Sequence, residues 1–261
     1  MSFPFYIDLF GLRLHPHPLF EMIAYTAGFQ LYLRTRHRWQ HAPIPFEKNL
    51  WIVVACIFGA LVGSHLLNIV EMPSDYLAHR TELSYWLAGK TIVGGLMGGW
   101  AGVELAKRII GVRYATGDAY VFPLIVGTAI GRIGCFLTGL EDATYGTPTS
   151  LPWGVDFGDG IARHPTQIYE ILFVLAVGLY LLYRSRRPYA NGYLFRFYMF
   201  AYVLFRFAVE FLKPHTDTYL GLSAIQIASL AAALFCARIF LPASTFGSAQ
   251  PAGEGIPADR D

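Results

Sequence analysis

Long apolar stretches recur along this chain and are separated by short polar segments. A helix of roughly 20 apolar residues crosses about 30 Å of hydrocarbon, which is the length class of these stretches. We predict membrane-spanning helices at residues 18–33, 50–70, 86–105, 120–137, 167–183, 194–212 and 222–241. The fold class expected from this pattern is an all-α integral membrane protein of about seven transmembrane helices, formed by a single domain at residues 1–241.

Two predicted spans and two non-helical segments depart from the plain pattern. The spans at 86–105 and 120–137 are rich in glycine and interrupted by charge, which a helix tolerates where it faces protein or a wet cavity. The longest loop, residues 138–165, has the length at which loops are often functional. Residues 242–261 are rich in Pro, Gly, Ser and Ala, and we expect a disordered cytoplasmic tail.

Basic residues alternate between the loops and set the expected orientation. They gather at residues 34–48, 107–113 and 184–187, whereas the loops containing Arg80, Arg163 and Lys213 each carry one basic residue. Cytoplasmic loops carry the excess of Lys and Arg in membrane proteins. We therefore expect the N-terminus outside, the C-terminus in the cytoplasm and the loop at 138–165 outside.

Composition supports the membrane interpretation and excludes some partners. Only 15% of residues are charged, against about 25% in an ordinary soluble domain. The formal net charge of +2 gives no indication of a nucleic-acid partner. Residues 1–14 lack the pattern of a cleavable signal peptide.

The cysteines and the first histidines carry no recognisable motif. Cys56, Cys135 and Cys236 lie far apart and have neither disulfide nor metal-ligand spacing, so we expect no metal site. We interpret Cys135 as a small core residue. His15 and His17, beside prolines, are interpreted as loop residues.

Charged residues inside the predicted spans are the main candidates for chemistry. Arg132 lies between Gly131 and Gly134, which would let a ligand approach the backbone. In the sixth span, Tyr202, Arg206 and Glu210 follow at i, i+4 and i+8 and share one helix face. A charge at mid-membrane costs about 2.5–3.5 kcal/mol on insertion scales.

Phosphate is the ligand that best explains two arginines inside the membrane. A guanidinium matches phosphate in a bidentate manner, and the abundant phosphate in a membrane is the phospholipid headgroup. A structural alternative stays open. Arg132 could pair with Glu170, and Arg206 with Glu210, simply to hold helices together.

Several motifs together resemble those of prolipoprotein diacylglyceryl transferases. The Gly-Arg-x-Gly segment stands at residues 131–134 and is followed by Gly139 with Glu141. Further motifs of that family correspond to Pro152-Trp153-Gly154, to residues 163–170, to Gly-Gly-Leu-x-Gly from Gly94, and to Tyr202, Arg206, Glu210 and Phe211. Asp118 lies at the expected distance before Arg132. The resemblance covers about residues 18–240.

The resemblance implies transfer of the diacylglyceryl group of phosphatidylglycerol to the lipobox cysteine thiol of a prolipoprotein in the bacterial inner membrane. It carries over Arg132 and Arg206 as phosphate binders and Glu141 and Glu210 as site carboxylates. The expected substrate-binding residues are Gly131, Gly134, Tyr202, Asp118, Arg163, His164 and Glu170. Neither a metal nor an organic cofactor is implied, because the lipid itself is the donor.

Four positions depart from the family pattern. Val93 stands where the family has His, Cys135 where it has Asn, Leu61 where it has Arg and Glu21 where it has Tyr. Lys90, three residues before Val93 on the expected helix, could act as a base or as a third cation. Alternatively, it extends to the membrane interface as many lysines do.

These departures keep two other functions open. One is transfer of a phospholipid-derived group to a different acceptor. The other is a non-catalytic lipid-binding or transport protein, because broken, glycine-rich spans with midplane charges occur in transporters. The two halves of the chain show no inverted repeat, which counts against a transporter.

Overall fold

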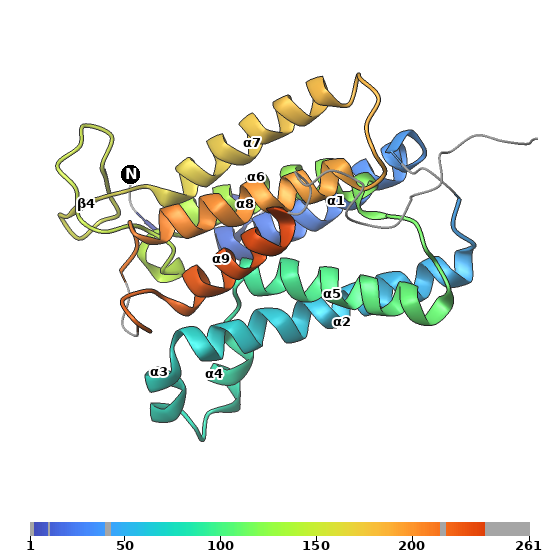
Figure 1. The fold of residues 1–261 in the computed structure, drawn as a ribbon. Coiled ribbons are helices and arrows are strands. Elements are labelled where there is room, and N and C mark those ends of the chain that lie inside the picture. Colours follow the sequence, from blue (N-terminus) through green and yellow to red (C-terminus); the bar gives the residue numbers. More distant parts are fainter. Residues whose placement is uncertain (1–2, 10, 40–42, 215–217, 238–261) are drawn as a thin grey trace, which may run out of the picture.

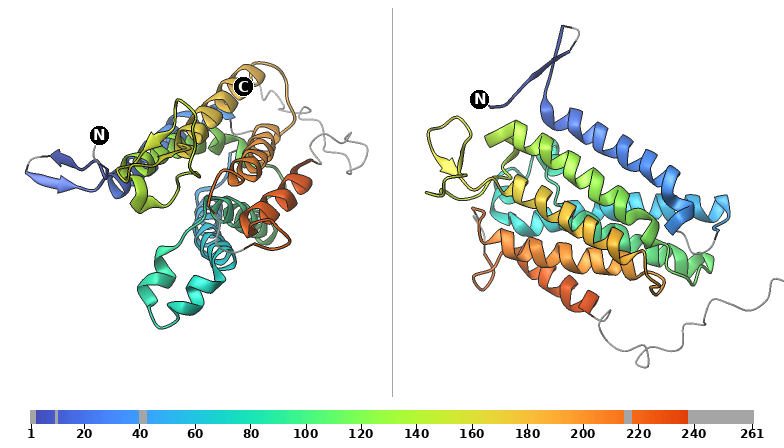
Figure 2. Two further views of the ribbon diagram at one scale, coloured as in Figure 1. Left: turned by 90° about the vertical axis from the view of Figure 1, so that its left-hand side faces the viewer. Right: turned by 90° about the horizontal axis from the view of Figure 1, so that it is seen from above.

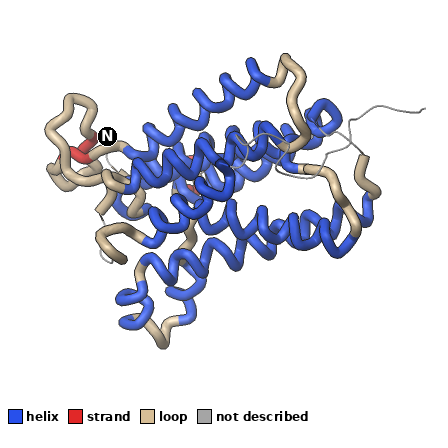
Figure 3. The backbone as a smooth tube through the Cα atoms, in the orientation of Figure 1, coloured by secondary structure: helices blue, strands red, loops and turns tan. Residues whose placement is uncertain are grey.

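The computed structural model describes residues 3–9, 11–39, 43–214 and 218–237. Helices make up most of this part of the chain (Figures 1 and 3). The α-helices are α1 Pro16–Trp39, α2 Phe46–Glu71, α3 Pro73–Ala78, α4 Leu83–Ala88, α5 Ile92–Ile110, α6 Val121–Thr138, α7 Thr166–Arg184, α8 Tyr193–Glu210 and α9 Ala224–Cys236. The short 3-10 helices are η1 Gly117–Tyr120 and η2 Gly139–Asp142. The predicted tail at 242–261 and the end of the last predicted helix lie outside the described residues.

Two small antiparallel hairpins lie outside the helices. Strands β1 Ile7–Leu9 and β2 Leu12–Leu14 pair before α1, and strands β3 Val155–Asp156 and β4 Ala162–Arg163 pair within the loop at 138–165. Both lie at the same end of the molecule (Figure 2). This is the end that the loop charges predict to be external.

The third predicted span was wrong as a single helix. Helix α4 ends at Ala88 and α5 begins at Ile92, after Thr91, whose Oγ1 accepts a hydrogen bond of 3.3 Å from the N–H of Gly94. Such a bond satisfies one of the free N–H groups at a helix start. Lys90 therefore precedes α5 and does not share a helical surface with Val93.

Three described helices are long and apolar enough to cross a membrane. They are Phe46–Glu71, Gly117–Asp142, which includes the 3-10 turns on either side of α6, and Thr166–Arg184; α9 is a shorter apolar helix. Trp51, Ile57 and Phe58 of α2 are each more than 60% exposed. Such a surface requires an apolar surrounding, and the chain is accordingly a mostly helical membrane protein.

Helices α2 and α5 pack with their backbones in contact. A Cβ added at Gly98 of α5 would lie 2.2 Å from the carbonyl oxygen of Gly59 in α2, and one added at Gly63 would lie 2.4 Å from that of Gly94. Only glycine permits this approach. The interpretation of the glycines at residues 94–99 as helix-packing residues is confirmed at Gly94 and Gly98.

The remaining long helices form a second group. Helix α1 packs along α6, α6 also contacts α7, and α9 links α8 to α2 and α5. Figure 2 shows α2 and α5 set apart from α1, α6 and α7. A cavity lies between the two groups.

Candidate functional site

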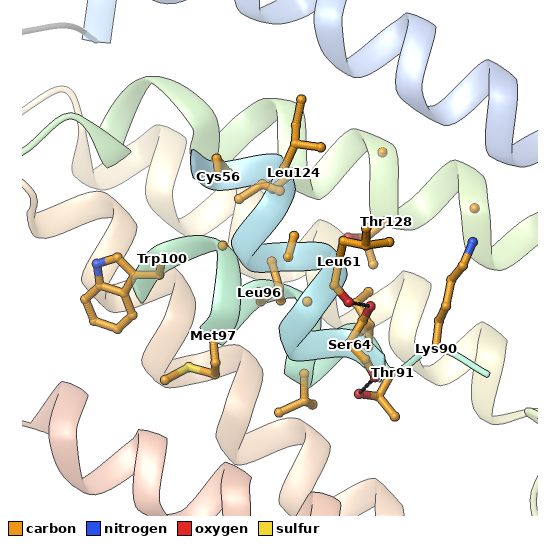
Figure 4. A pocket seen from close by; sticks show the side chains of 18 of the residues that line it. Cys56, Leu61, Ser64, Lys90, Thr91, Leu96, Met97, Trp100, Leu124 and Thr128 are labelled. Carbon is orange, nitrogen blue, oxygen red and sulfur yellow. Dashed lines mark hydrogen bonds between the residues drawn. The ribbon is translucent and has the colours of Figure 1, made fainter. Parts of the chain in front are cut away.

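The cavity is large, with a volume of about 2290 Å³. Ordinary small-molecule sites measure about 300–1,000 Å³. Its walls come mainly from α1, α2, α5 and α6, and much of it is apolar, lined by Cys56, Leu61, Leu96, Met97, Trp100 and Leu124 (Figure 4). A cavity of this size and character suits an acyl chain better than a small polar molecule.

One end of the cavity is polar and holds both arginines. Arg132 Nε lies 2.9 Å from Glu170 Oε2, and Arg206 Nη1 lies 3.3 Å from the same oxygen. Arg206 Nη2 also donates to Glu210 Oε2 at 2.7 Å, and the Tyr202 hydroxyl donates to Glu170 Oε1 at 2.6 Å. Glu170, only 2% exposed, is thus the anion that both arginines share.

Local sequence explains how these groups meet. The i, i+4, i+8 spacing places Tyr202, Arg206 and Glu210 on one face of α8, and all three are buried. Helix α7 begins after Pro165, so Glu170 follows in its second turn and projects toward that face. Arg132 reaches the same carboxylate from the last two turns of α6.

The ion pairs expected under the structural alternative are both present. Arg132 is nevertheless not saturated, because its contacts in the described chain use only Nε and Nη1, the latter toward Cys135 Sγ at 3.6 Å. A guanidinium has five N–H donors. The remaining donors of Arg132, whose side chain is 11% exposed in the cavity wall, can serve a ligand.

Lys213 is a site residue that the sequence prediction missed. It follows α8 and lines the cavity. The charges of Arg206 and Glu210 are close enough to shift its pKa. Burial, with the charge of Arg206 next in importance, lowers the pKa of Lys213 to about 8. The available signal was that Lys213 is the one basic residue of its loop besides a histidine and directly follows the span that carries Arg206 and Glu210.

The two predicted site glycines have different surroundings. A Cβ at Gly131 would meet no atom within 4 Å, and Gly131 lines the cavity. A Cβ at Gly134 would lie 2.6 Å from Cβ of Phe20 in α1. Gly131 therefore borders open space, while Gly134 allows α1 and α6 to pack closely.

Of the seven predicted substrate-binding residues, Gly131 alone lines this cavity. Tyr202 and Glu170 belong to the arginine network behind it and Gly134 to the contact with α1, whereas the remaining three residues belong to neither. Asp118 is buried at the far end of α6 and accepts hydrogen bonds from the N–H groups of Gly192 and Phe195 at 2.8 and 2.9 Å. It holds the start of α8 and is not brought to the arginines. The other two, Arg163 and His164, contact Asp159 at 2.6 Å and the Tyr169 hydroxyl at 3.1 Å, respectively.

Glu141 and Lys90 lie on the cavity wall but in exposed positions. The Glu141 side chain is 58% exposed and lies 3.2 Å from His15 Nε2. Lys90 is exposed, and its side chain extends away from the hydrogen bonds that Ser64 and Thr91 make (Figure 4). Both residues can reach a ligand in the cavity, and neither belongs to the buried arginine network.

A second group of polar residues, also missed by the sequence prediction, lies beside Arg132. His17 Nδ1 is 2.5 Å from Asp142 Oδ1, and Cys135 lies next to this pair. His17 belongs to the first turn of α1 and not to a loop, and Cys135 lines the cavity. The one available signal was that Cys135 directly follows the Gly-Arg-Ile-Gly segment.

Comparison with known proteins gives a consistent result. A family model described as prolipoprotein diacylglyceryl transferase matches residues 4–241. The phosphatidylglycerol–prolipoprotein diacylglyceryl transferase of Bordetella avium is 30% identical over 228 residues, covering 85% of this chain and 85% of that protein. Proteins of the same name from Bordetella bronchiseptica and Cupriavidus necator are 33% and 34% identical, over 84% and 81% of this chain and 86% of each relative.

The match runs through every element that forms the cavity and its polar end. It includes the helices that carry Arg132, Glu170 and Arg206, and so agrees with the motif resemblance. The chain belongs to the prolipoprotein diacylglyceryl transferase family.

Proposed function

We propose that this protein transfers the diacylglyceryl group of phosphatidylglycerol to the thiol of a lipobox cysteine in prolipoproteins. The curated relatives carry the name of this activity. The observation that carries the proposal is a large, mainly apolar cavity that ends at two arginines around one buried carboxylate. Acyl chains fit the apolar part, and the phosphate fits the arginine end.

The reaction is a displacement at the glycerol carbon that bears the phosphate. The acceptor thiolate forms a carbon–sulfur bond, the carbon–oxygen bond breaks, and glycerol phosphate leaves with the electron pair. Arg132 stabilises the charge that develops on the departing phosphate. Arg206, 3% exposed and bound to both Glu170 and Glu210, holds Glu170 and thereby orients Arg132.

We propose the bacterial inner membrane as the site of action, with seven spans and the N-terminus outside. Alternating loop charges support this orientation, and three described helices meet the requirements of a span. Arg132, Arg206 and Glu170 lie toward the same helix ends as the loop at 138–165. The reacting groups would then lie near the outer surface.

A transfer assay tests the proposal directly. Purified protein receives phosphatidylglycerol and a lipobox peptide, and glycerol phosphate release is followed together with the mass of the peptide. We expect release from the wild type, none from Arg132→Ala, and a large loss in Arg132→Lys, which keeps the charge but not the planar fork. Arg186→Lys, in the loop at the other end of α7, is the control with unchanged activity.

Transfer to a different acceptor is the second candidate. Val93 is 1% exposed and lines the cavity, so this wall lacks the histidine of the family pattern. The protein could consume phosphatidylglycerol with other nucleophiles but not with several lipobox peptides. That result would support the different acceptor and refute the lipobox cysteine as the acceptor. Phosphatidylglycerol binding without turnover under any condition would instead identify a lipid-binding protein.

A further inference from the structure

We propose that His17, Cys135 and Asp142 form a binding site for a transition-metal ion of the zinc class in the cavity wall. One nitrogen, the thiol sulfur and one carboxylate oxygen all lie within 4.8 Å of one another. The residues come from the start of α1, the last turn of α6 and η2. Tertiary packing therefore assembles the cluster, and no local spacing in the sequence reveals it.

The mixed ligand set selects the class of ion. Thiolate and imidazole favour zinc and its neighbours, whereas magnesium and calcium favour oxygen ligands. Two ligands about 2.0 Å from one tetrahedral ion lie about 3.3 Å apart. Because His17 Nδ1 and Asp142 Oδ1 are 2.5 Å apart, coordination through these two atoms would separate them by about 0.8 Å. His17, whose side chain is 43% exposed, has room for this movement.

Neighbouring groups orient the three ligands. The Thr144 hydroxyl donates to Asp142 Oδ2 and itself accepts from Gln167 Nε2 at 3.1 Å, which leaves Oδ1 directed at His17. On the other side, Arg132 Nη1 donates to Cys135 Sγ at 3.6 Å. Hydrogen bonds of this kind fix ligand orientation in metal sites.

The charges of the site balance in the presence of a divalent ion. The Cys135 thiolate and the Asp142 carboxylate together carry two negative charges, which offset the ion. The positive charge of Arg132 is met separately by Glu170. An ion bound here therefore leaves Arg132 able to hold a phosphate.

Three protein ligands leave a fourth position, which is the pattern of catalytic zinc sites. Resting on the proposed function, we assign this position to the thiol of the acceptor cysteine, which binds as thiolate and releases its proton to solvent. Alkylation of Cys135 itself would form a stable thioether and end turnover. Cys135 thus serves as a ligand and not as the acceptor.

Cobalt binding tests the site without relying on activity. The full chain in detergent is titrated with Co²⁺, and thiolate coordination is followed by near-ultraviolet charge-transfer absorption. We expect one ion per chain and loss of the band in Cys135→Ser. His17→Gln and Asp142→Asn should weaken binding by more than the roughly 10–100-fold typical of outer-shell changes, and Thr144→Val by about that range. Cys236→Ser, at the end of α9, is the matched control and should retain the band.

Two results would overturn the site: no band in the wild type, or a band that survives Cys135→Ser. Either result would mean that His17 and Asp142 form an ion pair and bind no metal. If Cys135→Ser does not fold, maleimide labelling of the wild type replaces it. Zn²⁺ should protect Cys135, and labelling unaffected by Zn²⁺ would contradict the proposal.

Adding an acceptor peptide separates this inference from the proposed function. A lipobox peptide should shift the cobalt spectrum, and the same peptide with serine in place of cysteine should not. A normal band without any diacylglyceryl transfer would refute the function and retain the ion site. Transfer at full rate in chelator, with no cobalt band, would refute the site and retain the function.

Discussion

Glu170 is the residue on which the polar end of the cavity depends. Its two oxygens contact Arg132, Arg206 and the Tyr202 hydroxyl, and almost none of it is exposed. Removing one partner from a buried ion pair leaves an uncompensated charge in a poorly solvated site. Here the loss of a single carboxylate would leave two arginines without their shared anion.

Glu170→Gln should therefore lower the free energy of unfolding by about 3–5 kcal/mol. Tyr202→Phe removes one hydrogen bond to the same charged group and should cost about 1.5–3 kcal/mol. Thermal unfolding in detergent gives both values. Equal stability of Glu170→Gln and the wild type would show that the two arginines do not depend on this carboxylate.

Lys213 should give phosphatidylglycerol binding a pH dependence. With a pKa of about 8, the ammonium is charged below pH 8 and neutral above it, so binding of an anionic lipid should weaken as the pH rises through this value. A charge-assisted hydrogen bond of about 1.5 kcal/mol corresponds to a loss of roughly tenfold in affinity.

Direct lipid binding without acceptor peptide, between about pH 6.5 and pH 9.5, isolates this effect from the acceptor thiol, whose reference pKa is about 8.5. Lys213→Arg should remove the pH dependence, because a guanidinium stays charged throughout this range. A steep fall in affinity that persists in Lys213→Arg would exclude Lys213 as its cause.

At the scale of the elements, the contact between α2 and α5 is the most constrained. Backbone atoms of the two helices meet where glycines face each other, so there is no side chain that could rearrange. The tight contact fixes the position of the wall that carries Leu61, Leu96 and Val93. Its glycines thus act on the cavity through the placement of the two helices.

Gly98→Ala should destabilise the protein by about 1–3 kcal/mol, the usual cost of overpacking, because the new Cβ would lie 2.2 Å from the Gly59 carbonyl oxygen. Gly95→Ala is the matched control on the same helix. Its Cβ would have its nearest neighbours at 3.7 and 3.8 Å, and the change should be tolerated. The melting temperatures of both variants are compared with that of the wild type. An equal decrease in the two variants would show that the close contact at Gly98 is not what limits stability.

At the scale of the whole molecule, the orientation across the membrane can be tested by labelling. In a background with all three cysteines replaced, single cysteines at positions 36 and 186 should be protected from an impermeant maleimide added outside. A cysteine at position 150, in the loop at 138–165, should react. External labelling at position 36 would reverse the proposed topology.

Sequence periodicity and helix geometry predicted much of this arrangement. The long helices follow the apolar stretches, and the i, i+4, i+8 spacing in α8 placed Tyr202, Arg206 and Glu210 together. The break between α4 and α5 falls at Gly89, Lys90 and Thr91, and it was missed because the apolar stretches on both sides were joined across this short polar segment. Hydropathy does not report where the backbone leaves the helix.

The groups that sequence could not reveal are those assembled by tertiary packing. His17, Cys135 and Asp142 belong to three elements and meet only when α1 packs on α6. Asp118 was assigned to the site by its distance from Arg132 along the chain, but α6 separates the two residues by most of its length. The distance between Asp118 and Arg132 along the chain therefore does not indicate that the two residues are neighbours in space.

The position of the cavity between two groups of helices has a kinetic consequence. Tyr25 and Phe29 of α1 and Ile57 and Leu61 of α2 line the cavity, and each is more than half exposed, so that the cavity is open between these two helices. A lipid can therefore enter sideways from the bilayer. The concentration that governs saturation is then the mole fraction of the donor lipid in the surrounding leaflet. Diluting that lipid with a zwitterionic one should slow turnover even when its total amount per volume is unchanged.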